Sequence, residues 1–254
     1  MLKKIFIACA LLASSTMAFA NGGTYLPAAP HYNGNFYLGV GIARDTGRAN
    51  VVDSVSTNDS TIPRLHAING DLGIDGIAGR LVGGYGVTFM NRYYLAVEGF
   101  GELTSNQGKT TIVGNGGVGS EAWQLRERYS YGVRLVPGFK LTDSTMFYGT
   151  VGWVRSRFQL TNSGKGSFDQ TGFVYIPNGV EKSRNGIAAG AGLQVMLANN
   201  VSMRAGWEWR RYRSFNSPLA TRVIEQSIVA RSRAEIKHLT TDQFYLDMIY
   251  HFTT

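Results

Sequence analysis

Residues 243–252 read Gln-Phe-Tyr-Leu-Asp-Met-Ile-Tyr-His-Phe, and this stretch decides the fold. Every second residue is large and apolar, and the intervening positions are mostly polar. The apolar set is Phe244, Leu246, Met248, Tyr250 and Phe252. A period of two is typical of a β-strand, whose successive side chains point to opposite faces. A strand of about ten residues with aromatic ends can cross a lipid bilayer at a tilt. We therefore expect a membrane-spanning strand, with the last strand of a soluble β-sandwich as the alternative.

The N-terminus has the features of a secretory signal peptide. Lys3 and Lys4 precede an apolar run, and Ala18 and Ala20 form an Ala-x-Ala signal-peptidase site. This order of charge, apolar run and small residues is typical of exported proteins. We therefore expect residues 1–20 to be cleaved.

The rest of the chain has the size of one all-β domain. We expect residues 21–34 to form a periplasmic lead and residues 35–254 to form the barrel. The only cysteine, Cys9, lies in the cleaved segment, so we expect a mature chain without disulfides. No later apolar run approaches the roughly 18 residues that a transmembrane helix needs.

The chain is basic, with a formal net charge of +8 that falls to +6 once Lys3 and Lys4 are removed. This balance could suit contact with anionic lipopolysaccharide or lipid head groups, but an ordinary solvated surface is the preferred interpretation. We expect no nucleic-acid partner, because the protein is exported and its basic residues are spread along the chain.

Seven further segments show strand periodicity, and long polar connections alternate with short turns. The predicted strands are 35–44, 78–89, 93–103, 123–140, 145–160, 185–197 and 201–213, followed by the final strand. The long connections are 45–77, 104–122, 161–184 and 214–237, and the short ones are 90–92, 141–144 and 198–200. The parity of the strand at 145–160 stays open, because both of its faces are about equally apolar.

Bacterial outer-membrane barrels have an even number of antiparallel strands, with short periplasmic turns and long extracellular loops. The alternation of connections therefore predicts an all-β fold, an eight-stranded antiparallel up-and-down transmembrane β-barrel. Its two termini are expected in the periplasm and its long loops outside the cell.

Three motifs carry a resemblance to a known family. They are Tyr-Leu-Ala-Val-Glu-Gly at 94–99, Gly-Ala-Gly-Leu-Gln at 190–194 and Arg-Ala-Gly-Trp-Glu-Trp at 204–209. Over residues 35–252 the chain resembles the small eight-stranded outer-membrane barrels, which include the OmpA membrane domain, OmpX and the opacity-type surface proteins. The resemblance implies that the final strand is the recognition signal for the barrel insertion machinery. Here Phe252 is followed by two threonines, which departs from the family's terminal Phe.

The inward positions of the predicted strands collect charges of both signs. They are Arg80, Glu98, Glu102, Arg134, Lys140, Arg204, Glu208, Arg210, Asp247 and His251. The interior of an eight-stranded barrel is just wide enough for side chains to fill it. We expect Glu98 and Glu208 to pair with luminal arginines, notably Arg134 and Arg204, and to form a plug. The alternative is a narrow or gated ion path.

Aromatic residues on the other parity are expected to face lipid or its interfaces. They are Trp207, Trp209, Tyr85, Phe89, Tyr93, Tyr131, Phe139, Phe244, Tyr250 and Phe252.

The sequence offers little for catalysis or metal binding. The mature histidines, His31, His66, His238 and His251, lack metal-binding spacing. Ser232, Glu235 and His238 could be combined into a lipid-modifying set. However, Ser232 and Glu235 are three residues apart, so on a strand they would point to opposite faces. We expect no catalytic residue, no metal and no cofactor.

These features favour a non-enzymatic surface protein with a structural or adhesive role, because long loops on a barrel are where binding functions reside. A small porin is the alternative, and an outer-membrane lipid-modifying enzyme is a third possibility. The expected partners are outer-membrane lipid and lipopolysaccharide, the insertion machinery, and a host or envelope ligand that contacts the loops.

Overall fold

The computed structural model describes residues 35–57, 68–113, 120–162, 179–224 and 228–252. The signal-peptidase site and the periplasmic lead lie outside these ranges, as do His31 and His66. The described strands are β1 (Asn35–Thr57), β2 (Ile68–Phe89), β3 (Tyr93–Thr104), β4 (Gln107–Val113), β5 (Ser120–Lys140), β6 (Thr145–Asn162), β7 (Gly179–Ala198), β8 (Val201–Tyr212), β9 (Phe215–Ile224) and β10 (Ile228–His251). Within the described part, no helix is both long and apolar enough to span a bilayer.

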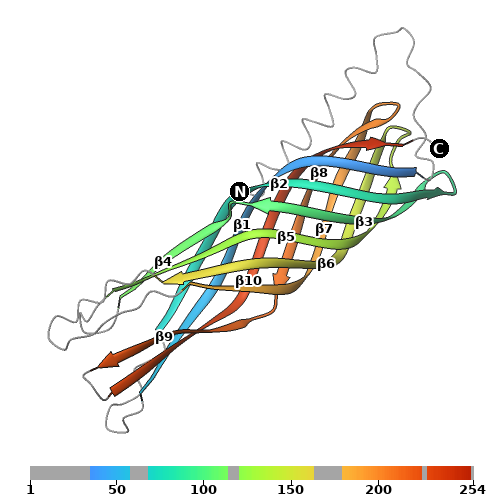
Figure 1. Ribbon diagram of the computed structural model, residues 1–254. Helices are drawn as coiled ribbons and strands as arrows, with labels where there is room; N and C mark the ends of the chain where they lie inside the picture. Colours follow the sequence, from blue (N-terminus) through green and yellow to red (C-terminus); the bar gives the residue numbers. More distant parts are fainter. Residues whose placement is uncertain (1–34, 58–67, 114–119, 163–178, 225–227, 253–254) are drawn as a thin grey trace.

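The strands form one antiparallel sheet that closes on itself. The order β1-β10-β8-β7-β6-β5-β3-β2 returns to β1 through the β1–β2 pairing. β4 pairs with β5 and β2, and β9 pairs with β10, and both lie at the same end of the barrel, where the strands of the ring extend furthest (Figure 1). The predicted all-β antiparallel barrel is confirmed. The described chain has ten strands where the sequence predicted eight, and each predicted strand overlaps one member of the ring.

Both ends of the described chain lie at one end of the barrel, here called the terminal end. The backbone N–H of Phe252 donates to the carbonyl of Phe36 at 2.9 Å. The three predicted short turns also lie there. Between β2 and β3, Met90 and Asn91 have φ angles of 52° and 53°, as in the type I′ turns of two-residue hairpins. The other end, where the strands extend furthest, is called the loop end.

The prediction of four long polar loops was wrong in part. Described strands enter all four segments, 45–77, 104–122, 161–184 and 214–237. The reason is visible in β2, where inward Leu72 and Ile74 are buried while the outward residues between them are small or polar. A strand that leaves the membrane presents polar side chains to water, so its mean polarity resembles that of a loop although its period of two persists.

The outer face of the ring carries a continuous apolar band. Toward the loop end this band stops at Ile42, Ile77, Leu103, Tyr129, Trp153, Ile187 and Phe244. The ten predicted interfacial aromatics and the five residues of the predicted insertion signal lie on this outer side. The structure also fixes the parity of β6, because Trp153 faces outward and Val154 is fully buried.

Candidate functional site

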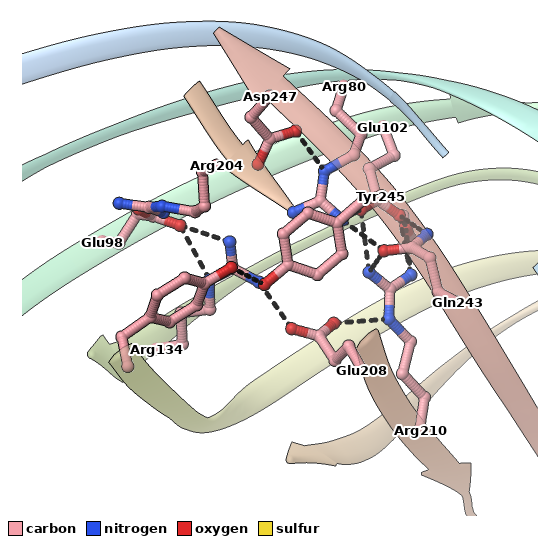
Figure 2. A network of polar contacts seen from close by, with 12 residues as sticks. Arg80, Glu98, Glu102, Arg134, Arg204, Glu208, Arg210, Gln243, Tyr245 and Asp247 are labelled. Atoms are coloured by element: carbon pink, nitrogen blue, oxygen red, sulfur yellow. Dashed lines mark hydrogen bonds and ion pairs between the residues drawn. The ribbon is translucent and has the colours of Figure 1, made fainter. Parts of the chain in front are cut away.

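The candidate site is the barrel interior, which contains a network of charged side chains. β2, β3, β5, β8 and β10 supply them, because each strand places every second residue inward. Figure 2 shows eight of the ten predicted inward residues together, namely Arg80, Glu98, Glu102, Arg134, Arg204, Glu208, Arg210 and Asp247. These four arginines and four carboxylates balance in formal charge. Low-dielectric surroundings tolerate charges that are paired in this way far better than isolated ones.

Glu98 lies at the centre of one half of the network. It sits opposite Arg134 in the β3–β5 register, and the two side chains approach to 2.5 Å. Its other oxygen lies 2.5 Å from Arg204 of β8 and accepts a hydrogen bond from the Tyr37 hydroxyl at 2.8 Å. Arg134 also reaches Glu208 at 2.5 Å. The expected pairs of Glu98 and Glu208 with luminal arginines are therefore present. Glu98–Arg204 and Arg134–Glu208 join strands that are not neighbours in the sheet.

Glu102 lies at the centre of the other half. Arg210 donates to both of its carboxylate oxygens, at 2.6 and 2.8 Å, and Arg80 approaches to 3.1 Å. Such two-pronged contacts use the planar fork of the guanidinium and fix the orientation of both groups. Arg210 also contacts Glu208 at 2.8 Å, which connects the two halves. Arg80 in turn lies 3.2 Å from Asp247.

Neutral inward residues that the sequence analysis did not single out complete the network. Gln243 accepts hydrogen bonds from Arg80 and, at 2.8 Å, from Arg210. The guanidinium carbon of Arg80 lies 4.1 Å from the centre of the Tyr245 ring, a cation–π contact. Inward parity would have found both Gln243 and Tyr245, but a search restricted to charged residues did not.

Tyrosine rings fill the interior beside the network, and Tyr37 and Tyr94 are buried near its terminal end. The hydroxyls of Tyr148 and Tyr245 are 2.8 Å apart. A Cβ atom built on Gly206 would come within 2.6 Å of both hydroxyls. The inward glycines thus provide the space that the rings occupy, as expected for the inner face of a narrow barrel.

Two further inward residues of the sequence analysis lie at the terminal end. His251 Nε2 is 2.9 Å from the hydroxyl of Ser202, which also accepts from the Gln194 amide at 2.9 Å. Lys140 ends β5 near Asp143, apart from the network of Figure 2. Residues that share inward parity therefore belong to different clusters when they lie at different heights along the barrel axis.

A second polar cluster lies toward the loop end. The Asn106 amide nitrogen donates to Asp45 at 2.6 Å and to Glu127 at 2.9 Å, and all three side chains are buried. Asn106 sits at the break between β3 and β4, and Glu127 lies two residues beyond the outward Tyr129 that ends the apolar band on β5. Burial, reinforced by the neighbouring Asp45 carboxylate, raises the pKa of Glu127 to about 7.

Beyond this cluster, the interior of the loop end is an apolar core. Its fully buried members include Leu72, Trp123, Leu125, Phe158, Leu160, Ile236 and Leu239. The Phe158 ring packs edge-on against Tyr212, with ring centres 5.1 Å apart. This part of the protein therefore has its own packed interior beyond the lipid-facing band.

Two side chains of the catalytic set that the sequence could offer are described, those of Glu235 and His238. Glu235 is half-buried and contacts Lys237 at 3.2 Å, whereas His238 is exposed with a φ angle of 51°. The side chain of Ser232 lies outside the described residues. Among the side chains that are described, no group of three or more histidine, cysteine, aspartate or glutamate residues is arranged to hold a metal ion.

A closed antiparallel barrel that is apolar outside and charged inside is a membrane-spanning β-barrel. The model of the outer membrane protein beta-barrel domain family matches residues 6–252, so the chain belongs to this family of the bacterial outer membrane. No curated protein sequence is significantly similar to it.

Solved structures of small outer-membrane proteins are similar to this one. The attachment invasion locus protein Ail of Yersinia pestis is 16% identical, with a TM-score of 0.38 over 87% of this chain and 99% of its own. OprG of Pseudomonas aeruginosa is 14% identical, with a TM-score of 0.48 over 89% of this chain and all of its own. The outer membrane protease OmpT of Escherichia coli is 8% identical, with a TM-score of 0.48 over 89% of this chain and all of its own.

Proposed function

We propose that this protein is a non-enzymatic surface protein of the outer membrane, in which a plugged barrel anchors a folded, surface-exposed loop end. The observation that carries the proposal is the charge network across the barrel interior. Arg134 joins Glu98 to Glu208, and Arg210 joins Glu208 to Glu102, so one chain of contacts spans β3, β5 and β8. Their side chains are at most 2% exposed.

The layers on both sides of the network support a plug over an ion path. Tyr37 and Tyr94 lie on the terminal side, near the first residues of β1 and β3, and the apolar core around Trp123 and Phe158 lies on the loop side. An ion entering from either end would have to displace packed aromatic side chains before it reached the charges. Because dehydrating an ion in such surroundings is costly, we expect no steady conductance.

The loop end supports a role in contact with other molecules. β1 and β10 pair from Asp45 to Thr57 beyond the apolar band, and Val51 and Ile236 are fully buried between the extended strands. A packed support holds surface residues in place and so lowers the entropy that a binding partner must offset. With the termini in the periplasm, this end would face the cell exterior and could adhere to a host or envelope surface.

Conductance separates the proposal from its porin alternative. The mature chain is refolded, its folding is verified by a heat-modifiability gel, and it is inserted into a planar bilayer beside an established porin as positive control. Silence from folded protein supports the plugged anchor, and discrete steady openings contradict it. Lipid A hydrolysis or acyl transfer by the wild type, lost in His238→Ala, would instead favour an enzyme.

A further inference from the structure

Three exposed arginines lie close together on the outer face of the barrel. Arg155 belongs to β6, and Arg211 and Arg213 belong to β8 and the residue that follows it. Asn185 of β7 lies between them, because it pairs with Arg155 and its carbonyl accepts from the Arg213 backbone at 3.2 Å. Neighbouring strands are about 4.8 Å apart, so the side chains of Arg155 and Arg213 can reach one group over Asn185.

The arginines stand directly at the edge of the apolar band. Trp153 and Ile187, which end the band on β6 and β7, are paired with each other, and Ile187 is paired with Arg211. Two residues further toward the loop end on the same strands, Arg155 is paired with Asn185. The outer face therefore changes from apolar to cationic within one row of residues, as the bilayer changes from hydrocarbon to head groups.

The positive charge of this site is not neutralised by the neighbouring acid. Glu181 contacts Arg157 at 2.5 Å and Arg128 at 3.3 Å, which are the cations next to the site. Across the barrel at a similar level, Arg44 is paired with Asp75 at 3.3 Å. Among the described residues, no acid lies within ion-pair distance of Arg155, Arg211 or Arg213.

We propose that Arg155, Arg211 and Arg213 bind the phosphate of an anionic lipid head group in the leaflet that adjoins the loop end. The guanidinium forks match the oxygens of a phosphate, and the acyl chains of the same lipid lie against Trp153 and Ile187. A free phosphate ion could bind the guanidinium groups, but it has no acyl chains to lie against Trp153 and Ile187. Contact with the acyl chains therefore distinguishes a lipid from a free phosphate. The Asn185 amide lies where it can donate to the same phosphate.

Contact quenching tests the site, because bromine on lipid chains quenches the fluorescence of adjacent tryptophans such as Trp153. The full mature chain is refolded into phosphatidylcholine nanodiscs that contain increasing amounts of brominated phosphatidylglycerol. A parallel series uses phosphatidylcholine brominated at the same chain positions. The ratio of the two apparent binding constants measures the preference for the anionic head group. The variant R155Q/R211Q/R213Q removes the site, and R44Q/R48Q/K109Q removes the same charge from exposed positions elsewhere.

We expect the wild type and R44Q/R48Q/K109Q to prefer phosphatidylglycerol, and R155Q/R211Q/R213Q to lose about tenfold or more of that preference. An equal loss in both triple variants would overturn the proposal, because net charge rather than a site would explain it. An unchanged preference in R155Q/R211Q/R213Q would also overturn it. Sodium phosphate that displaces the lipid at an ionic strength where sodium chloride does not would identify a free-anion site instead.

Discussion

Arg134 lies directly opposite Glu98 on the neighbouring strand, and its guanidinium contacts both Glu98 and Glu208 at 2.5 Å. Glu208 comes from β8, so this one arginine joins opposite walls of the barrel. The contact crosses the interior of the barrel.

Removing one charge from the network destabilises the barrel more than removing a balanced pair. In Glu98→Gln, Arg204 loses its carboxylate partner at 2.5 Å and stays buried as an uncompensated charge, at a cost of about 3–5 kcal/mol. The double variant Glu98→Gln/Arg204→Met restores the balance and should cost less than the sum of the two single changes. Urea unfolding in vesicles measures all three variants.

The exposed pair of Arg44 and Asp75 is the matched control for that cycle. Its side chains are 69% and 61% exposed, so Asp75→Asn should cost less than about 1 kcal/mol. If Asp75→Asn lowered the free energy of unfolding as much as Glu98→Gln does, burial of the network would not increase the cost of removing a charged partner.

Inward and outward glycines of β2 should respond differently to a larger side chain. Gly86 lies under the Tyr94 ring, so Gly86→Val forces the ring to move and should destabilise the barrel by about 1–3 kcal/mol. Gly79, on the same strand, has no atom within 4 Å of a built Cβ and faces outward, so Gly79→Val should be tolerated. Heat-modifiability and urea midpoints of the two variants make the comparison, and equal losses would contradict the packed interior.

The contribution of Glu127 to stability, taken as the difference between the wild type and Glu127→Gln, should fall as the pH rises from about 4.5 to 7. The pKa of Glu127 is raised to about 7 by burial and by Asp45, so the folded protein holds a proton that the unfolded chain releases near pH 4.5. This contribution is fully present below pH 4.5, is lost as the pH rises through 7, and is of order 2 kcal/mol. Urea midpoints at pH 5 and 8 measure it.

Glu127→Gln should remove this part of the pH dependence, because an amide keeps the polar contact with Asn106 but does not titrate. Glu181→Gln, which removes one carboxylate from an exposed ion pair with Arg157, is the matched control for the loss of one charge. A wild-type slope in Glu127→Gln would refute the role of this carboxyl.

Side-chain parity predicted the interior well, because burial on a closed sheet depends only on which face a residue occupies. Glu98, Arg134 and Arg204 were assigned to the interior by counting in steps of two. The contact between Arg210 and Glu102 was not predicted, because the relative height of individual residues on β3 and β8 depends on the stagger of the whole ring.

Strand length was predicted poorly beyond the membrane. Leu72 and Ile74 continue the inward alternation, but polar outward neighbours concealed it, and the segment was interpreted as a loop. The cluster of Asp45, Asn106 and Glu127 was missed for the same reason, since all three residues come from strand extensions or from the break between β3 and β4. Composition therefore misleads where a strand leaves lipid for water, whereas parity does not.

The central claim is that side chains plug the barrel, and single-channel conductance tests it most directly. The mature chain is refolded, checked by heat-modifiability and inserted into a planar bilayer at moderate salt. A plug built around Arg134, Glu98 and Glu208 predicts no discrete conductance from folded protein. Steady, unitary current steps that scale with salt concentration would show a water-filled path past these residues and would contradict the account.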